Sequence, residues 1–146
     1  MTTGPRLAVR DLTLVPTPSL SIGATIGDVA AALVRERVPA LLLGSGEAIV
    51  SEHDIVRAVA RGRAPSEPAR LFATPDPIAV STDAPALEAV EVMLRHGLRA
   101  VVVVDDARRS VGMLTLVHAV EALLAVAEVP AWLSGLRIAL RVEMDR

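Results

Sequence analysis

The 146-residue sequence contains no cysteine, lysine, asparagine, glutamine or tyrosine, and it has one tryptophan and one phenylalanine. Without cysteine there is no disulfide, no thiolate nucleophile and no cysteine-ligated zinc site. With so few aromatic residues, a platform on which nucleic-acid bases stack is not expected. We therefore expect neither thiol chemistry nor nucleic-acid binding from this chain.

Long apolar runs and blocks of like charge are also missing. Apolar runs such as residues 39–43 and 100–104 are far shorter than the roughly 18 residues that cross a bilayer. Residues 1–10 lack the apolar core of a signal peptide. Acidic and basic residues number 17 and 15, and the formal net charge is −2. These features predict a cytoplasmic protein with no membrane partner, and 52% of apolar residues is enough for a compact core.

An internal repeat is the strongest pattern in the sequence. When Ile26 is aligned with Ala86, two segments share apolar positions with the spacing of a helix that buries one face. Beyond a longer polar turn at residues 105–110 the register shifts, so that Ile49 aligns with Met113. Such a shift is expected for a duplicated unit, because loops tolerate insertions. The matched helix positions are Ile26, Val29, Ala30, Leu33 and Val34 with Ala86, Ala89, Val90, Met93 and Leu94.

Each repeat has the pattern of strand, helix, strand, strand, helix. Thr25 and Asp28 have the spacing of a helix capping box, and Gly62 and Gly97 each follow a helix, where glycine is favoured. One such unit cannot cover its own sheet. The expected fold class is therefore α+β, with two β-α-β-β-α units packed sheet to sheet about a pseudo-twofold axis and the helices outside. The elements are predicted at residues 19–22, 26–37, 40–43, 48–51 and 52–61, and at 78–80, 85–96, 98–104, 111–115 and 116–126.

The predicted organisation has four parts. Residues 1–63 hold an N-terminal lead-in and the first motif, and residues 77–127 hold the second motif. Residues 64–76 form a proline-containing linker with a short helix near residues 69–73. Residues 128–146 form a tail, in which Trp132 lies on one side of a candidate helix.

The duplicated order of elements resembles the pair of CBS (cystathionine β-synthase) motifs known as a Bateman module, over roughly residues 10–126. Three local matches carry the resemblance. Residues 76–89 look like the family's opening strand and first helix, and residues 40–43 and 100–105 look like its hydrophobic strand. Residues 48–54, Ala-Ile-Val-Ser-Glu-His-Asp, look like its pattern of Gly, two apolar residues, Ser or Thr, two variable residues and Asp.

The resemblance implies a site for an adenosine nucleotide that contains Ser51, Asp54, Val50 and Ile78. It implies that Asp54 bonds the ribose hydroxyls and that Ser51 lies by a phosphate. The chemistry agrees, because a carboxylate can accept both donors of a diol and a helix N-terminus attracts anions. Ser51 and Asp54 also have the spacing of an ordinary helix cap, so capping alone is the alternative interpretation. Ala48 replaces the family's glycine, and its methyl group could narrow the site.

The second repeat departs further from the family pattern. Gly112 and Thr115 are retained, but His118 stands at the aspartate position. A neutral imidazole has one donor and one acceptor, so it cannot accept from two ribose hydroxyls. We expect a second site of Thr115, His118 and Arg99 that is degenerate or altered in its ligand preference, and for Arg99 we favour a role as a surface or interface residue.

The function that the resemblance implies is regulatory, not enzymatic. The chain would be a stand-alone CBS pair that binds AMP, ADP, ATP or S-adenosylmethionine in the cleft between its motifs. It would signal to an unknown effector protein by a conformational change. CBS pairs generally form dimers, so a homodimer is expected, and Ile55, Val56 and Val59 are candidate contact or core residues. The alternative is a dimeric interaction scaffold with decayed pockets and no nucleotide.

Catalysis and metal binding find little support in the sequence. No nucleophile elbow and no phosphate-binding loop motif is present. The three histidines, His53, His96 and His118, have no second ligand at metal spacing. We expect no required cofactor and no metal site.

Overall fold

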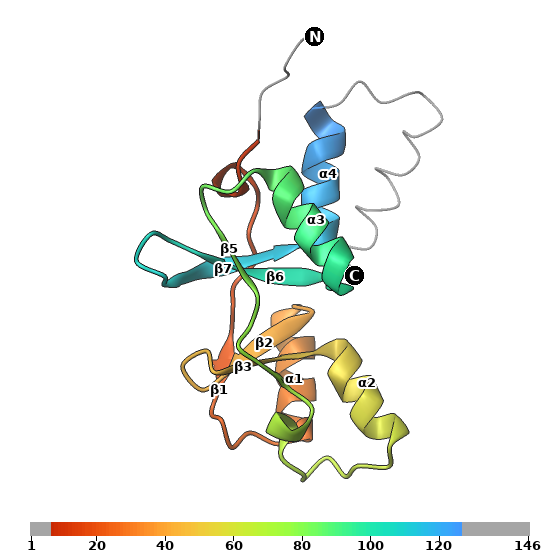
Figure 1. The fold of residues 1–146 in the computed structure, drawn as a ribbon. Coiled ribbons are helices and arrows are strands. Elements are labelled where there is room, and N and C mark those ends of the chain that lie inside the picture. Colours follow the sequence, from red (N-terminus) through yellow and green to blue (C-terminus); the bar gives the residue numbers. More distant parts are fainter. Residues whose placement is uncertain (1–6, 127–146) are drawn as a thin grey trace, which may run out of the picture. The chain divides into compact units, whose positions relative to one another are not determined.

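The computed structural model describes residues 7–126, which fold as two compact units (Figure 1). The first-repeat unit is Val15–Ala79, and the second-repeat unit contains residues 7–14 and 80–126. Each unit has its own β-sheet and two α-helices, which confirms the predicted α+β class and the duplication. The sheet-to-sheet packing of the two units stays a prediction.

The first-repeat unit is built around a four-stranded sheet of order β1-β2-β3-β4. β1 runs parallel to β2, and the other two pairs are antiparallel. α1 packs on β2, and α2 packs on β3 and on α1. All four residues of β2 are buried, which explains the uninterrupted apolar run in the sequence. The elements are β1 (Ser19–Leu20), α1 (Ile26–Glu36), β2 (Ala40–Leu43), β3 (Ala48–Ser51), α2 (Glu52–Ala60), the 3-10 helix η2 (Ala69–Leu71) and β4 (Thr74–Pro75).

The second-repeat unit has a three-stranded sheet of order β5-β6-β7, with β6 and β7 antiparallel. Its core joins the inner faces of α3 and α4 to β6 and β7, with Met93, Val103 and Leu114 fully buried. The β6–β7 register shifts between Val103 and Val104, beside the turn where the alignment of the two repeats also shifts. The elements are η1 (Val9–Asp11), β5 (Ala79–Ser81), α3 (Ala86–His96), β6 (Ala100–Val104), β7 (Ser110–Thr115) and α4 (Leu116–Val126).

The observed helix bounds follow the repeat found in the sequence. The first and last residues of α1 align with those of α3 when the two repeats are matched. The first residue of α2 likewise aligns with the first residue of α4. Thr25 and Asp28 form the predicted capping box at the start of α1: the Asp28 N–H donates to Thr25 Oγ1 at 3.1 Å, and the Thr25 N–H donates to Asp28 Oδ2 at 3.0 Å. α1 ends one residue earlier than predicted, because Arg37 adopts a left-handed conformation.

The segment that precedes each repeat in the chain belongs to the unit of the other repeat. The N-terminal lead-in belongs to the second-repeat unit and the linker to the first-repeat unit, an exchange that the sequence analysis does not predict. The predicted organisation joins the N-terminal lead-in to the first motif, whereas residues 7–14 belong to the second-repeat unit. There the Val9 N–H donates to the Ala84 carbonyl at 2.8 Å, and the Ala86 N–H donates to the Leu7 carbonyl at 2.8 Å. These bonds give partners to backbone groups at the start of α3 and in the loop before it.

The linker makes the same contacts in the first-repeat unit. The Ala69 N–H donates to the Ala24 carbonyl at 3.0 Å, and the Ile26 N–H donates to the Glu67 carbonyl at 2.9 Å. Both pairs stand at the positions that the alignment of the repeats matches with the pairs made by the lead-in. The linker therefore makes the same backbone hydrogen bonds to the first-repeat unit as the lead-in makes to the second-repeat unit.

Two further expectations concern the chain as a whole. Within residues 7–126, no helix has the length and apolar character needed to span a bilayer. The candidate helix with Trp132 lies outside the described residues, as does the rest of residues 127–146.

Candidate functional site

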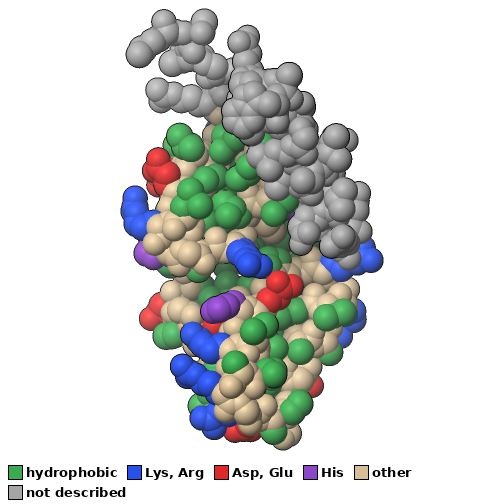
Figure 2. Space-filling model, turned by 90° about the vertical axis from the view of Figure 1, so that its right-hand side faces the viewer, with side chains coloured by type: hydrophobic (Ala, Val, Ile, Leu, Met, Phe, Trp, Pro, Cys, Tyr) green, Lys and Arg blue, Asp and Glu red, His purple; other side chains and the backbone are tan. Residues whose placement is uncertain are grey.

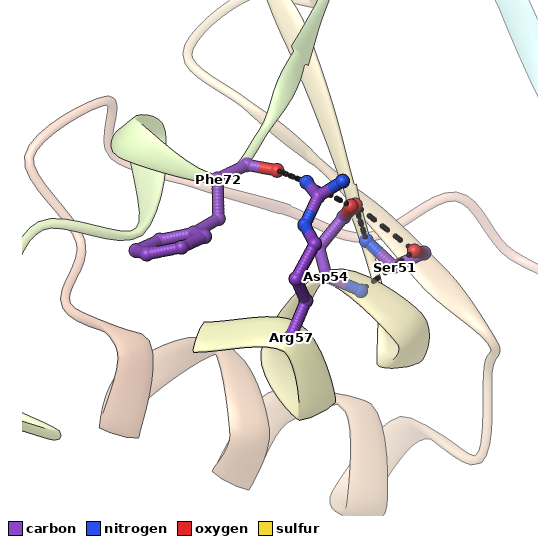
Figure 3. Close-up of polar contacts among 4 residues, drawn as sticks. All are labelled: Ser51, Asp54, Arg57 and Phe72. Atoms are coloured by element: carbon purple, nitrogen blue, oxygen red, sulfur yellow. Dashed lines mark hydrogen bonds and ion pairs between the residues drawn. The ribbon is translucent and has the colours of Figure 1, made fainter. Parts of the chain in front are cut away.

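The candidate site of the first repeat lies where β3 ends and α2 begins (Figure 3). Ser51 has an extended backbone and is the N-cap of α2. The Asp54 N–H donates to Ser51 Oγ at 3.2 Å, and the Ser51 N–H and hydroxyl each donate to Asp54 Oδ2 at 2.9 Å. The capping arrangement that the spacing allows is therefore present, and it fixes the Asp54 carboxylate at the first turn of the helix.

Asp54 is buried, with 8% of its surface exposed, and its carboxylate has a cationic partner. One Nη atom of Arg57 donates to Asp54 Oδ1 at 3.0 Å and to the Phe72 carbonyl oxygen at 3.2 Å (Figure 3). Burying a carboxylate costs free energy unless it is paired and hydrogen-bonded, and this site meets both conditions. The contact also ties the segment after η2 to α2.

Arg57 and Phe72 are site residues that sequence reasoning missed. The i, i+3 spacing of Asp54 and Arg57 on a helix was a usable signal for their ion pair. The Phe72 contribution left no such signal, because a backbone carbonyl accepts the bond whatever the side chain. The Phe72 ring is buried and lies 5.9 Å from the Arg63 guanidinium carbon.

The second repeat has a contact of the same form at the start of α4. Thr115 Oγ1 and His118 Nδ1 are 2.6 Å apart, and the His118 N–H donates to Thr115 Oγ1 at 3.1 Å. One ring nitrogen of His118 is thus already bonded within its own helix turn. The Arg99 side chain is exposed, and the Arg99 carbonyl accepts from the Leu116 N–H at 2.8 Å.

The remaining predicted positions lie in different settings. The Val50 side chain is fully buried in β3, where it belongs to the core. Ala48 is also buried and pairs with Leu43 of β2. Ile78 comes just before β5 and is 38% exposed. The contacts therefore bring together Ser51 with Asp54, and Thr115 with His118.

A shallow hollow of about 460 Å³ lies on the first-repeat unit, along α1 and the connection that precedes it. Ser51 and Asp54 are not among its lining residues, which are Leu20, Ser21, Gly23, Ala24, Asp28, Ala31 and Arg35. Across the described part of the chain, no three His, Asp or Glu side chains gather closely enough to hold a metal ion.

Known proteins place this fold in a family. The family model of the CBS domain matches residues 69–125. A CBS domain protein from Pyrobaculum aerophilum, solved in complex with AMP, is 36% identical, and the alignment covers 83% of this chain and 100% of that chain with a TM-score of 0.71. This chain belongs to the CBS domain family.

Two further solved structures share the fold of this CBS pair at lower identity. The CBS domain pair of protein MJ0100, in complex with 5′-methylthioadenosine and S-adenosyl-L-methionine, is 24% identical over 83% of this chain and 98% of its own, with a TM-score of 0.72. The CBS-pair protein CBSX2 from Arabidopsis thaliana is 19% identical over 86% and 99%, with a TM-score of 0.68. No curated protein matches the sequence.

Proposed function

We propose that this CBS pair is a regulatory module that binds an adenosine-containing ligand at Ser51 and Asp54 of the first repeat. The candidate ligands are AMP, ADP, ATP and S-adenosylmethionine. The observation that carries the proposal is the Ser51–Asp54 arrangement at the start of α2, in a chain 36% identical to a protein solved with AMP.

The polar groups at this position suit such a ligand. A carboxylate accepts hydrogen bonds only, so Asp54 is the group that would take the ribose diol. Ser51 and the first N–H groups of α2 are the groups that would face a phosphate, because a helix N-terminus favours anions. Ile78 would offer an exposed apolar side chain to the ligand, and Val50 would contribute its backbone because its side chain lies in the core.

The second repeat is proposed to be the weaker site. His118 stands where the first repeat has Asp54, and its ring nitrogen is engaged with Thr115. Arg99 would serve this site only by turning its exposed side chain toward it. One ligand for each chain is therefore the expected stoichiometry.

A second copy of the chain is the partner proposed for α2. Its residues Val56 and Val59 are 64% and 65% exposed, and hydrophobic side chains reach the surface in the lower part of Figure 2, on the side where α2 lies. Exposed apolar side chains on one helix face are typical of an association surface. The dimer would pass the ligand-dependent change to an effector protein, and Val56→Asp is expected to yield monomers in sedimentation.

The test is a comparison of melting temperatures with and without millimolar AMP, ADP, ATP or S-adenosylmethionine. A ligand at 100 times its dissociation constant stabilises the folded chain by about 2.7 kcal/mol. Asp54→Ala should abolish the shift, and Asp28→Ala, which breaks the equivalent capping box on α1, should keep it. If no adenosine compound shifts the wild-type melting temperature, the chain is better explained as a dimeric interaction scaffold without a nucleotide.

A further inference from the structure

The Asp54 carboxylate is held by a guanidinium that the helix cap does not need. α1 carries the same Thr/Ser-x-x-Asp capping box, with Asp28 in the position of Asp54. The residue three positions after Asp28 is Ala31, and the box forms there without an arginine. Arg57 is therefore an addition to the cap of α2, and its role has to be sought in the carboxylate itself.

The hydrogen bonds on Asp54 define which acceptor positions remain. A carboxylate has about four lone-pair sites, two on each oxygen. Oδ2 accepts from both the N–H and the hydroxyl of Ser51, so its two sites are filled. Oδ1 accepts from Arg57, so it has one site left.

A vicinal diol that binds both carboxylate oxygens needs one site on each. The Ser51 hydroxyl can release Oδ2 by rotation about a single bond, and the Ser51 N–H keeps the cap closed. Arg57 does not have to move, because Oδ1 already has a site free. The diol-binding form of the site thus retains the Arg57 contact.

The position of Arg57 is fixed from a second side. The nitrogen that bonds Oδ1 also donates to the Phe72 carbonyl, which belongs to the segment after η2 and not to α2 (Figure 3). Phe72 is itself buried. The carboxylate is therefore held in one rotation by a donor anchored outside the helix, and this is the kind of restraint that a two-point hydrogen-bonding site requires.

We propose that Arg57 is a positioning residue that sets the selectivity of the Asp54 site for a ligand with a vicinal diol. The inference rests on the proposed function, because it assumes that Asp54 receives the ribose. The second repeat agrees with it: both members of the pair are exchanged there, His118 for Asp54 and Glu121 for Arg57. A carboxylate steadied by a guanidinium occurs at this position only in the repeat that we expect to bind.

The experiment measures the dissociation constants of AMP and 2′-deoxy-AMP by titration calorimetry on the full chain. The variants are Arg57→Met, which keeps an extended side chain but removes its donors, and Arg57→Lys, which restores a cation. Arg35→Met on α1 is the matched control, since Arg35 is also an exposed arginine in an ion pair. A hydroxyl bonded to a charged group is worth about 10- to 100-fold in affinity, so wild type should prefer AMP by that factor.

The expected result is that Arg57→Met lowers the preference for AMP to about threefold or less, that Arg57→Lys restores most of it, and that Arg35→Met leaves it unchanged. A loss of folding alone would weaken both ligands equally and leave their ratio intact. If Arg57→Met keeps the wild-type ratio, the role of Arg57 is refuted and the binding function stands. If wild type binds both compounds equally, the proposed ribose site is refuted instead, and if it binds none of AMP, ADP, ATP and S-adenosylmethionine, the proposed function is refuted.

Discussion

Ser51 and Asp54 exchange three hydrogen bonds across the first turn of α2, two of them on a single carboxylate oxygen. The same two residues are a helix cap and the candidate ligand site. The two interpretations that the sequence left open are therefore compatible in space: the cap uses Oδ2, and Oδ1 keeps an acceptor site.

Removing the Asp54 carboxylate should destabilise the chain more than removing the one at Asp28. Asp54→Ala leaves the Ser51 N–H and hydroxyl without their acceptor in a partly buried setting and takes one of two acceptors from Arg57, with an expected loss of about 1–3 kcal/mol. Asp28 is exposed, so water can replace its bonds and Asp28→Ala should cost less. Urea unfolding of both variants measures the difference, and equal losses would argue against a buried network at Asp54.

The exchanged lead-in should stabilise the second-repeat unit. Val9 is fully buried among residues of that unit, so Val9→Ala removes two carbons from a packed core and should cost about 2 kcal/mol. Val34→Ala, on α1 at a position that is 79% exposed, is the control and should change little. Hydrogen exchange read by mass spectrometry should show faster exchange in β6 and β7 of Val9→Ala. Unchanged exchange there would contradict the assignment of the lead-in to that sheet.

The residues that follow α1 and α3 predict opposite changes in stability when a glycine is introduced after α1 and when one is removed after α3. Arg37 and Gly97 occupy corresponding positions, and both are left-handed, with φ of 54° and 64°. A residue other than glycine costs about 1–2 kcal/mol in the left-handed conformation. Glycine avoids this cost but loses more backbone entropy on folding, so its net advantage is smaller. Arg37→Gly should therefore raise the free energy of unfolding by about 0.5–1 kcal/mol, and Gly97→Ala should lower it by about 1 kcal/mol. Effects of the reverse sign in urea unfolding would refute this.

The carboxylates of Asp28 and Asp105 predict that the folded chain loses stability as the pH falls. The Thr25 N–H and hydroxyl lower the pKa of Asp28, and the Arg109 N–H is the main cause that lowers the pKa of Asp105. A pKa lower in the folded than in the unfolded state means that the stabilisation is present above the ordinary value of 3.8 and is lost as the pH falls below it. The double variant Asp28→Asn/Asp105→Asn should show a shallower loss of stability between about pH 5 and 3 than wild type. An identical pH dependence would contradict these two assignments.

The elements of each repeat could be predicted because helix and strand periodicity is a local property of the sequence. β2, β3 and α4 have the predicted bounds, and the capping box of Thr25 and Asp28 is confirmed. The exchange of lead-ins could not be read in this way, because it depends on which backbone groups lack partners after folding. Even so, the alignment that pairs the two repeats also pairs Val9 with Ala69, so extending it toward the N-terminus would have revealed η1.

The candidate site was predicted only in part, for a related reason. The spacing of Ser51 and Asp54 gave their mutual contact, since it is set by one helical turn. The bond from Arg57 to the Phe72 carbonyl joins two separate elements through a backbone atom, which no side-chain pattern specifies. Val50 matched the family pattern by position, but its side chain faces the core, as alternate residues of a half-buried strand do.

The central claim is that the first repeat of this CBS pair binds an adenosine ligand through Asp54. Titration calorimetry with AMP on wild type, Asp54→Ala and His118→Ala tests it most directly. The account predicts one molecule of AMP for each wild-type chain, no binding heat with Asp54→Ala, and an unchanged isotherm with His118→Ala. Undiminished AMP binding by a folded Asp54→Ala, or loss of binding with His118→Ala alone, would contradict it.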